Sequence, residues 1–233
     1  MTGRTKPPLA GQPRPLDEAA LPRSLLQRPK RATQVLADFL FFPLRVLIPD
    51  PLSERFGLSS LRCERMAVVL QEMRGRCLDI GAHDNLLLRH YADRHQNSES
   101  LSSIGLDVID WNGQCLVLPH SASLPFPDAS FDCVCFVACL NHIPERREAL
   151  AEARRVLKPN GRLMITMISR LVGYLDHRLR WWGEHSERNT HEDELDGMNK
   201  LEILSLLDET GFVLKRRVSF FYGMNSLFIA SQR

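Results

Sequence analysis

Apolar residues recur with two different periods along the chain from residue 60 onward. Between Leu61 and Met73 they stand three and four positions apart, which predicts a helix with one buried face. Between Phe131 and Val137 they stand at every second position, which predicts a strand. The same patterns predict helices at 144–157 and 199–210, the start of a helix at 86–91, and strands at 77–80, 104–108, 115–118, 162–167, 212–220 and 226–230.

This alternation of strands and helices predicts the α/β class. Pro144 at the start of a helix, and the run Lys158 to Gly161 after it, are typical of helix ends. Strands that alternate with helices form a parallel sheet that is covered on both faces. The last two strands are joined by only Tyr222 to Asn225, so we expect them to be antiparallel.

The first 34 residues have a different composition. They hold six prolines, seven basic residues and two acidic ones. A basic, proline-rich segment with few apolar residues cannot bury enough surface to offset the entropy of ordering. We therefore expect a mobile tail at 1–34, for which a polybasic contact to acidic lipid is an alternative role.

An apolar run follows at 35–49, inside a segment that ends near residue 58. The run is too short for a membrane span of about 20 residues, and Asp38, Pro43 and Arg45 interrupt it. Two interpretations stay open. The run forms a helix that packs over the domain as a lid, or it forms an interfacial helix that brings the protein to a lipid-linked substrate. The main domain then extends over 59–233.

Composition narrows the class of protein further. The chain has 233 residues and a net charge of +2, which excludes a nucleic-acid surface over the whole molecule. Its six cysteines form no C-x-x-C pair and lie among apolar neighbours, as expected for buried, reduced thiols. The first thirty residues contain no secretory signal. We expect a cytoplasmic protein, with peripheral membrane contact through residues 1–49 as an option.

Candidate ligand-binding residues follow two of the predicted strands. In an open α/β sheet, ligands bind beyond the carboxyl ends of the strands. The turn from Asp79 to Asn85 follows the first strand; Gly81 permits close approach of a ligand and Asn85 tolerates a positive φ. Asp107 ends the second strand, where an acidic side chain can accept both hydroxyl groups of a ribose.

Three stretches carry a resemblance to a known family. They are Leu124 to Asp132 (LPFPDASFD), Asn141 to Pro144 (NHIP) and Glu152 to Leu163 (EARRVLKPNGRL). With them, residues 60–168 resemble the class I methyltransferases that use S-adenosylmethionine (SAM), in the small-molecule branch with a methyltransferase type 11-like domain. The resemblance implies a Rossmann-like, doubly wound, seven-stranded and mostly parallel sheet with its last strand antiparallel. It also implies SAM as cofactor, S-adenosylhomocysteine as product, and a small-molecule or glycan acceptor.

The resemblance also implies a set of cofactor-binding residues. The turn at Asp79 and Gly81 would hold the methionine end of the cofactor, Asp107 the ribose, and the residues before Leu124 the adenine. The chain departs from the family at His83 and Asn85, which replace glycines, and at His120, which replaces an Asp. The full set of implied cofactor-binding residues is Asp79, Gly81, Ala82, Asn85, Asp107, Val108, His120, Ser121, Phe136 and Asn141.

The catalytic candidate is His142, which follows the fourth strand. A methyl acceptor that is a hydroxyl group needs a general base, and the titration range of histidine suits that role. An insert at about 169–198, with Trp181 and Trp182, would cover the substrate, and Tyr222 is a further candidate for the lining. We expect no metal site, although His185 and His191 stand among acidic residues.

Two other functions stay open. His83 and Asn85 in the first turn are compatible with a non-catalytic methyltransferase-like protein that binds a partner. The basic tail is compatible with a methyltransferase acting on RNA or protein, although the dispersed charge argues against nucleic acid. The sequence leaves the oligomeric state open.

Overall fold

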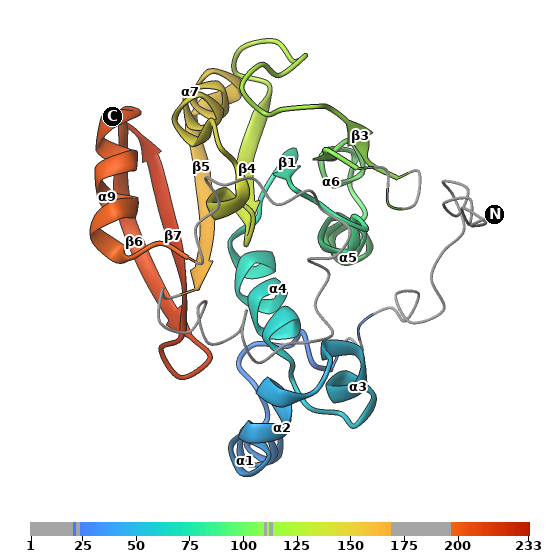
Figure 1. The fold of residues 1–233 in the computed structure, drawn as a ribbon. Coiled ribbons are helices and arrows are strands. Elements are labelled where there is room, and N and C mark those ends of the chain that lie inside the picture. Colours follow the sequence, from blue (N-terminus) through green and yellow to red (C-terminus); the bar gives the residue numbers. More distant parts are fainter. Residues whose placement is uncertain (1–20, 22–23, 110, 112–113, 169–196) are drawn as a thin grey trace, which may run out of the picture.

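A seven-stranded sheet lies at the centre of the molecule (Figure 1). The computed structural model describes residues 21, 24–109, 111, 114–168 and 197–233. The strand order is β3-β2-β1-β4-β5-β7-β6, and β7 runs antiparallel to both of its neighbours. The expected fold class is thereby confirmed. The strands are β1 (Cys77–Ile80), β2 (Ile104–Asp107), β3 (Leu116–Val117), β4 (Phe131–Val137), β5 (Leu157–Ile168), β6 (Phe212–Phe220) and β7 (Asn225–Gln232).

Helices cover both faces of the sheet, and each face has its own apolar core. One core joins the sheet to α4 and α5, and the other joins it to α7 and α9. Apolar burial on both faces stabilises this three-layer arrangement. The helices are α1 (Ala32–Leu40), α2 (Phe42–Leu47), α3 (Asp50–Arg55), α4 (Leu61–Glu72), α5 (Leu86–His95), α6 (Ser98–Leu101), α7 (Arg146–Val156) and α9 (Lys200–Glu209), with a 3₁₀ helix at Leu140–His142.

The predicted elements agree with the structure except at their ends. The strands predicted at 77–80, 131–137 and 212–220 have the predicted bounds. The strand predicted from Arg162 begins earlier, at Leu157, because Leu157 already pairs with Phe131 before the register shifts. The run from Lys158 to Gly161, which was expected to end the preceding helix, therefore belongs to the first part of β5.

The expected tail at 1–34 is wrong over its last part. Leu21, Leu25 and Leu26 are buried in the core on the α4 and α5 side of the sheet, and α1 begins at Ala32. Three leucines within six positions supply the apolar burial that the composition of the whole segment did not predict. Residues 1–20, 22 and 23 lie outside the described residues.

The apolar run at 35–49 forms two short helices. The chain turns at Phe41 between α1 and α2, and Pro43 lies in the first turn of α2, where its missing N–H group costs no hydrogen bond. Within the described residues, no helix is long and apolar enough to cross a membrane. None of the six cysteines forms a disulfide, and Cys115 alone is only half-buried.

Candidate functional site

The strand order reverses between β1 and β4, which marks the ligand-binding edge of the sheet. From β1 the order runs through β2 to β3 on one side and through β4 to β5 on the other. The carboxyl ends of β1, β2 and β4 meet at this switch point, where open α/β sheets bind their ligands. Asp79, Asp107 and the segment after Val137 therefore belong to one site.

The turn after β1 is held tightly against its neighbours. The backbone amides of Gly81 and Ala82 donate to the carbonyl of Leu106 at 2.9 and 3.0 Å. The thiol of Cys139 donates to the carbonyl of Ile80 at 2.9 Å. A Cβ on Gly81, whose φ is +73°, would lie 2.6 Å from the Cβ of Cys139. Gly81 is therefore required for the close approach of the two strand ends.

His83 and Asn85 take the backbone conformation that glycine would take. Their φ angles are 51° and 58°. The amide of His83 donates to Asp107 at 2.9 Å, and its ring lies on Trp111 with the ring centroids 4.2 Å apart. Asn85 donates through Nδ2 to the carbonyl of Gln114 at 3.2 Å. Both residues thus brace the turn, and a cofactor contact of Asn85 stays a prediction.

Asp79 is a buried carboxyl group with an unused oxygen. Burial, together with the smaller effects of the nearby carboxylates of Asp107 and Asp84, raises the pKa of Asp79 to about 8. Among the described residues, nothing forms a hydrogen bond with its Oδ1 atom. A buried polar atom without a partner is costly, so the position favours a ligand that brings a positive charge or a donor. The ammonium group of SAM fits this requirement.

Asp107 has a fixed orientation at the end of β2. Its Oδ1 accepts from the amide of Val108 at 2.8 Å, and its Oδ2 accepts from the amide of His83. Oδ1 also accepts from the amide of Ile109 at 3.3 Å, whereas Oδ2 can accept a second hydrogen bond, so the ribose role is compatible with these contacts. Val108 exposes its apolar side chain beside Asp107. An exposed apolar group next to a ribose-binding position suits an adenine ring.

The segment before Leu124 contains a second unused polar atom. Ser121 is buried, and among the described residues nothing forms a hydrogen bond with its Oγ. His120 is exposed. The predicted adenine contacts of these residues stay a prediction, and the buried hydroxyl of Ser121 fits them.

The ion pair between Glu152 and Arg155, which the sequence did not predict, holds the LPFPD motif in place. The guanidinium of Arg155 donates to the carbonyls of Leu124 and Phe126 at 2.9 and 2.8 Å and to Asp128 at 2.8 Å. Glu152 accepts from the amide of Leu124 at 2.8 Å and pairs with Arg155. The regular three-residue spacing of Glu152 and Arg155 in a helix could have indicated their pairing.

The segment after β4 positions the catalytic candidate. Asn141 is buried, and its Nδ2 lies 3.0 Å from Nε2 of the half-buried His142. Thr166 of β5 accepts from the amide of Ala138 at 2.9 Å and fixes the start of this segment. Phe136, predicted to bind the cofactor, is completely buried in the core toward α7 and α9, and its cofactor contact stays a prediction.

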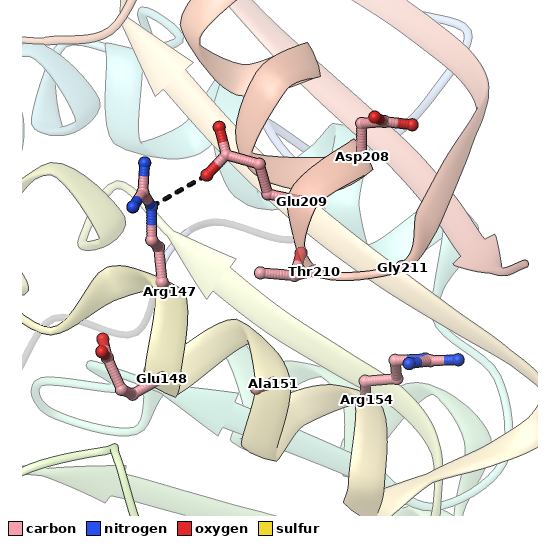
Figure 2. A pocket seen from close by; sticks show the side chains of 8 residues that line it. All are labelled: Arg147, Glu148, Ala151, Arg154, Asp208, Glu209, Thr210 and Gly211. Carbon is pink, nitrogen blue, oxygen red and sulfur yellow. Dashed lines mark ion pairs between the residues drawn. The ribbon is translucent and has the colours of Figure 1, made fainter.

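A surface depression of about 460 Å³ lies between α7 and α9 (Figure 2). An ion pair of 2.8 Å between Arg147 and Glu209 crosses it. The depression is lined by Gly211, which directly precedes β6. It therefore lies toward the amino ends of the parallel strands. It is therefore separate from the candidate site, and no residue predicted from the sequence lines it.

Several sequence candidates lie outside the described residues. These are the cover segment from 169 to 196, with Trp181, Trp182, His185 and His191. In the part of the chain that the structure describes, no group of three or more His, Cys, Asp or Glu side chains could hold a metal ion. Tyr222 is described, and it packs against α1 and α2.

The strand order defines the fold, which is that of the class I SAM-dependent methyltransferases. Residues 78–165 match the family described as a methyltransferase domain. The match runs from the second residue of β1 into β5 and includes the ends of β1, β2 and β4.

Curated relatives match part of the chain. It is 33% identical over 120 residues to the ubiquinone/menaquinone biosynthesis C-methyltransferase UbiE of Bordetella avium, with 46% of each chain covered. It is 34% identical over 79 residues to the protein of that name from Vibrio cholerae, which covers 32% of this chain and 30% of the relative. The chain thus matches less than half the length of these relatives.

Solved structures extend the similarity of the fold. A SAM-dependent methyltransferase from Aquifex aeolicus is 16% identical, with a TM-score of 0.54, and the match covers 73% of this chain and 90% of that one. A possible histamine N-methyltransferase from Thermotoga maritima is also 16% identical, with a TM-score of 0.56 and coverage of 86% and 97%. At this identity, the similarity concerns the fold alone.

Proposed function

We propose that the chain transfers a methyl group from SAM to a small-molecule acceptor. The observation that supports this best is the buried carboxyl group of Asp79, with its unused oxygen at the switch point of a methyltransferase fold. The family match over 78–165 supports the same class of reaction. SAM supplies an activated methyl group on a positively charged sulfur, so the protein mainly has to align the reactants and exclude water.

In this proposal, different residues of the site bind different parts of the cofactor. Asp79 and the turn at Gly81 and Ala82 bind its methionine end, and Asp107 binds the ribose. Val108 and Ser121, together with His120, surround the adenine. Asn141 orients the cofactor or the acceptor from the segment after β4. Residues from β1, β2 and β4 thus meet around one ligand.

The acceptor class is a small molecule or glycan. The curated relatives are named as C-methyltransferases of ubiquinone and menaquinone biosynthesis. This makes a carbon acceptor on a molecule of that kind the first to be tested. A cytoplasmic location with peripheral membrane contact belongs to the same proposal.

His142 is proposed as the general base. The exchange His142→Gln keeps a polar side chain but removes the titrating imidazole. We expect kcat for S-adenosylhomocysteine formation to fall by about 100-fold or more, with the SAM dissociation constant unchanged. The matched control is His95→Gln, since His95 is exposed on α5. An unchanged kcat, or a fall only in SAM affinity, would assign His142 to a different role.

The alternative is a methyltransferase-like protein that binds a partner and has no catalytic activity. It is favoured by the ring of His83, which lies on Trp111 beside the cofactor turn. A side chain at this position reduces the space that a glycine would leave. Titration with SAM separates the two functions, because the alternative requires that the intact chain does not bind it.

A further inference from the structure

We infer that α1 to α3 form a docking face for an anionic lipid surface, at the edge of the sheet that carries the candidate site. The outer side of α1 and α2 is apolar and open to solvent. Leu36 is 58% exposed and Leu40 is 61% exposed, and Val35, Phe39, Leu44 and Leu47 are also exposed. A contiguous exposed apolar patch is typical of a site that contacts another surface. These six residues are called the apolar face below.

The polarity of α1 and α2 is inverted relative to an ordinary surface helix. Asp38 of α1 and Arg45 of α2 are buried, and each is the only buried residue of its helix. Arg45 donates to Glu64 of α4 at 2.7 Å and to the carbonyl of Ser59 at 2.6 Å. Asp38 accepts from the amide of Ser59 at 2.9 Å and pairs with Lys30. These buried polar contacts fix the rotation of both helices, so the apolar side must point outward.

Aromatic contacts hold the same helices against the sheet. The ring of Phe42 meets Tyr222 edge-on at 5.0 Å, and the guanidinium of Arg45 lies 4.7 Å from the ring centroid of Phe221. Phe221 and Tyr222 stand in the turn that follows β6. The apolar face is therefore presented by a fixed part of the fold.

The apolar face lies on the side of the molecule where the site opens. Strand β6 is antiparallel to β7, which is antiparallel to β5, so β6 ends at the same edge as the parallel strands. Figure 1 shows α1, α2 and α3 below this edge. Arg62 at the start of α4 pairs with Glu54 of α3 at 2.7 Å. Burial raises the pKa of Asp84 in the cofactor turn, but His83 and, with a smaller effect, Arg62 lower it. Arg62 thus lies between α3 and the cofactor turn.

The charges around the apolar face favour anionic lipid as its partner. Between residues 24 and 58, all of which the structure describes, Arg31 and Arg55 are the exposed charged side chains. The acidic residues of this range, Asp38, Asp50 and Glu54, are buried or half-buried. Exposed apolar residues in a segment whose exposed charges are all basic are typical of interfacial binding to negatively charged membranes. A symmetric contact with a second copy would instead bring the same basic residues together.

Docking at a lipid surface would present the site to acceptors dissolved in that surface. This inference rests on the peripheral membrane contact of the proposed function and assigns it to named residues, and it does not depend on methyl transfer. Short helices that lie on a membrane need no spanning segment.

The test is flotation of the full chain with vesicles. The vesicles contain phosphatidylcholine alone or phosphatidylcholine mixed with phosphatidylglycerol. The double variant L36S/L40S removes two leucines from the apolar face. The matched control L101S/L201S removes two leucines that are 67% and 76% exposed on α6 and α9. SAM affinity, thermal unfolding and molar mass in solution are measured for all three proteins.

We expect the wild-type chain to float with the anionic vesicles and bind the neutral vesicles more weakly. L36S/L40S should lose about tenfold or more in partitioning, and L101S/L201S should change less than about twofold. SAM affinity should be the same in all three proteins, which separates this test from that of the proposed function.

Outcomes of three kinds would overturn the inference. The first is a wild-type chain that binds no vesicles, or an equal loss of binding in both variants. The second is a wild-type dimer that L36S/L40S converts to a monomer, which would make the face a contact between two copies. The third is a lower thermal stability of L36S/L40S alone without vesicle binding, which would mean that the chain itself covers the face.

Discussion

The exchange Asp79→Asn should make the protein more stable at pH 8 and weaken SAM binding. Burial raises the pKa of Asp79 from 3.8 to about 8, so the folded protein keeps a proton that the unfolded chain releases. The unfolding free energy of the wild type therefore contains a contribution that is present below pH 3.8 and is lost as the pH rises to about 8. Asparagine has the same shape and does not titrate. At pH 8 we expect the variant to be more stable by on the order of 3 kcal/mol.

The same exchange should weaken SAM binding by about 100-fold, because it removes the charge that faces the ammonium group. In the wild type, binding of a cation favours the ionised form of Asp79. We therefore expect proton release on binding below about pH 8, and an affinity that falls as the pH falls. Calorimetric titrations in buffers of different ionisation enthalpy measure the released proton.

The control is Asp208→Asn. Asp208 is exposed and stands at the opposite edge of the sheet, where its loss should change stability by less than about 0.5 kcal/mol. Urea unfolding of all three proteins at pH 5 and pH 8 gives the comparison. A difference between wild type and Asp79→Asn that does not grow with pH would contradict the account of Asp79.

The exchange Arg45→Met should lower the free energy of unfolding by about 3–5 kcal/mol, because it removes the fully buried partner of two buried acidic groups. Methionine keeps much of the volume of arginine but cannot donate to Glu64, to Ser59 or to the carbonyl of Asp38. Lys30 still pairs with both carboxylates. The expected loss is the cost of an incomplete buried network.

The matched control is Arg55→Met, since Arg55 is an exposed arginine of the same N-terminal segment. Its loss should change stability by less than about 0.5 kcal/mol. Urea denaturation gives both values. Equal and small effects of the two exchanges would show that the Arg45 contacts do not hold α1 and α2 in place.

The centre of the sheet could be predicted from local patterns because β1, β2 and β4 are short and largely buried. A run such as Cys77 to Ile80, with all four residues buried, needs no tertiary information to be identified as a strand. The early start of β5 could not be predicted in this way. It depends on the pairing of Leu157 with Phe131, which are far apart in the sequence.

The N-terminal helices show where sequence patterns fail. Apolar periodicity predicts that the apolar side of a helix faces the core. On that basis, Asp38 and Arg45 were interpreted as interruptions of the apolar run. In the structure these two residues are the buried ones, because Glu64 of α4 and the backbone of Ser59 satisfy them. A pattern of residue types contains no information about such distant partners.

The candidate site was predictable in position more than in detail. The strand ends located Asp79 and Asp107 correctly at the switch point. The cofactor contact of Phe136 stays a prediction, because its position along the chain does not show which way its buried side chain faces. The bracing of the turn by His83 was also out of reach, since it depends on Trp111 and on the carboxylate of Asp107.

The most direct test of the SAM site is calorimetric titration of the full chain with SAM and S-adenosylhomocysteine, together with Asp107→Ala. We expect the wild type to bind both ligands with micromolar affinity and the variant to lose binding, because the carboxylate that accepts the ribose hydroxyls is gone. Circular dichroism of the variant checks that it is folded. An intact, folded chain that binds neither ligand would contradict the proposed function and would favour the partner-binding alternative.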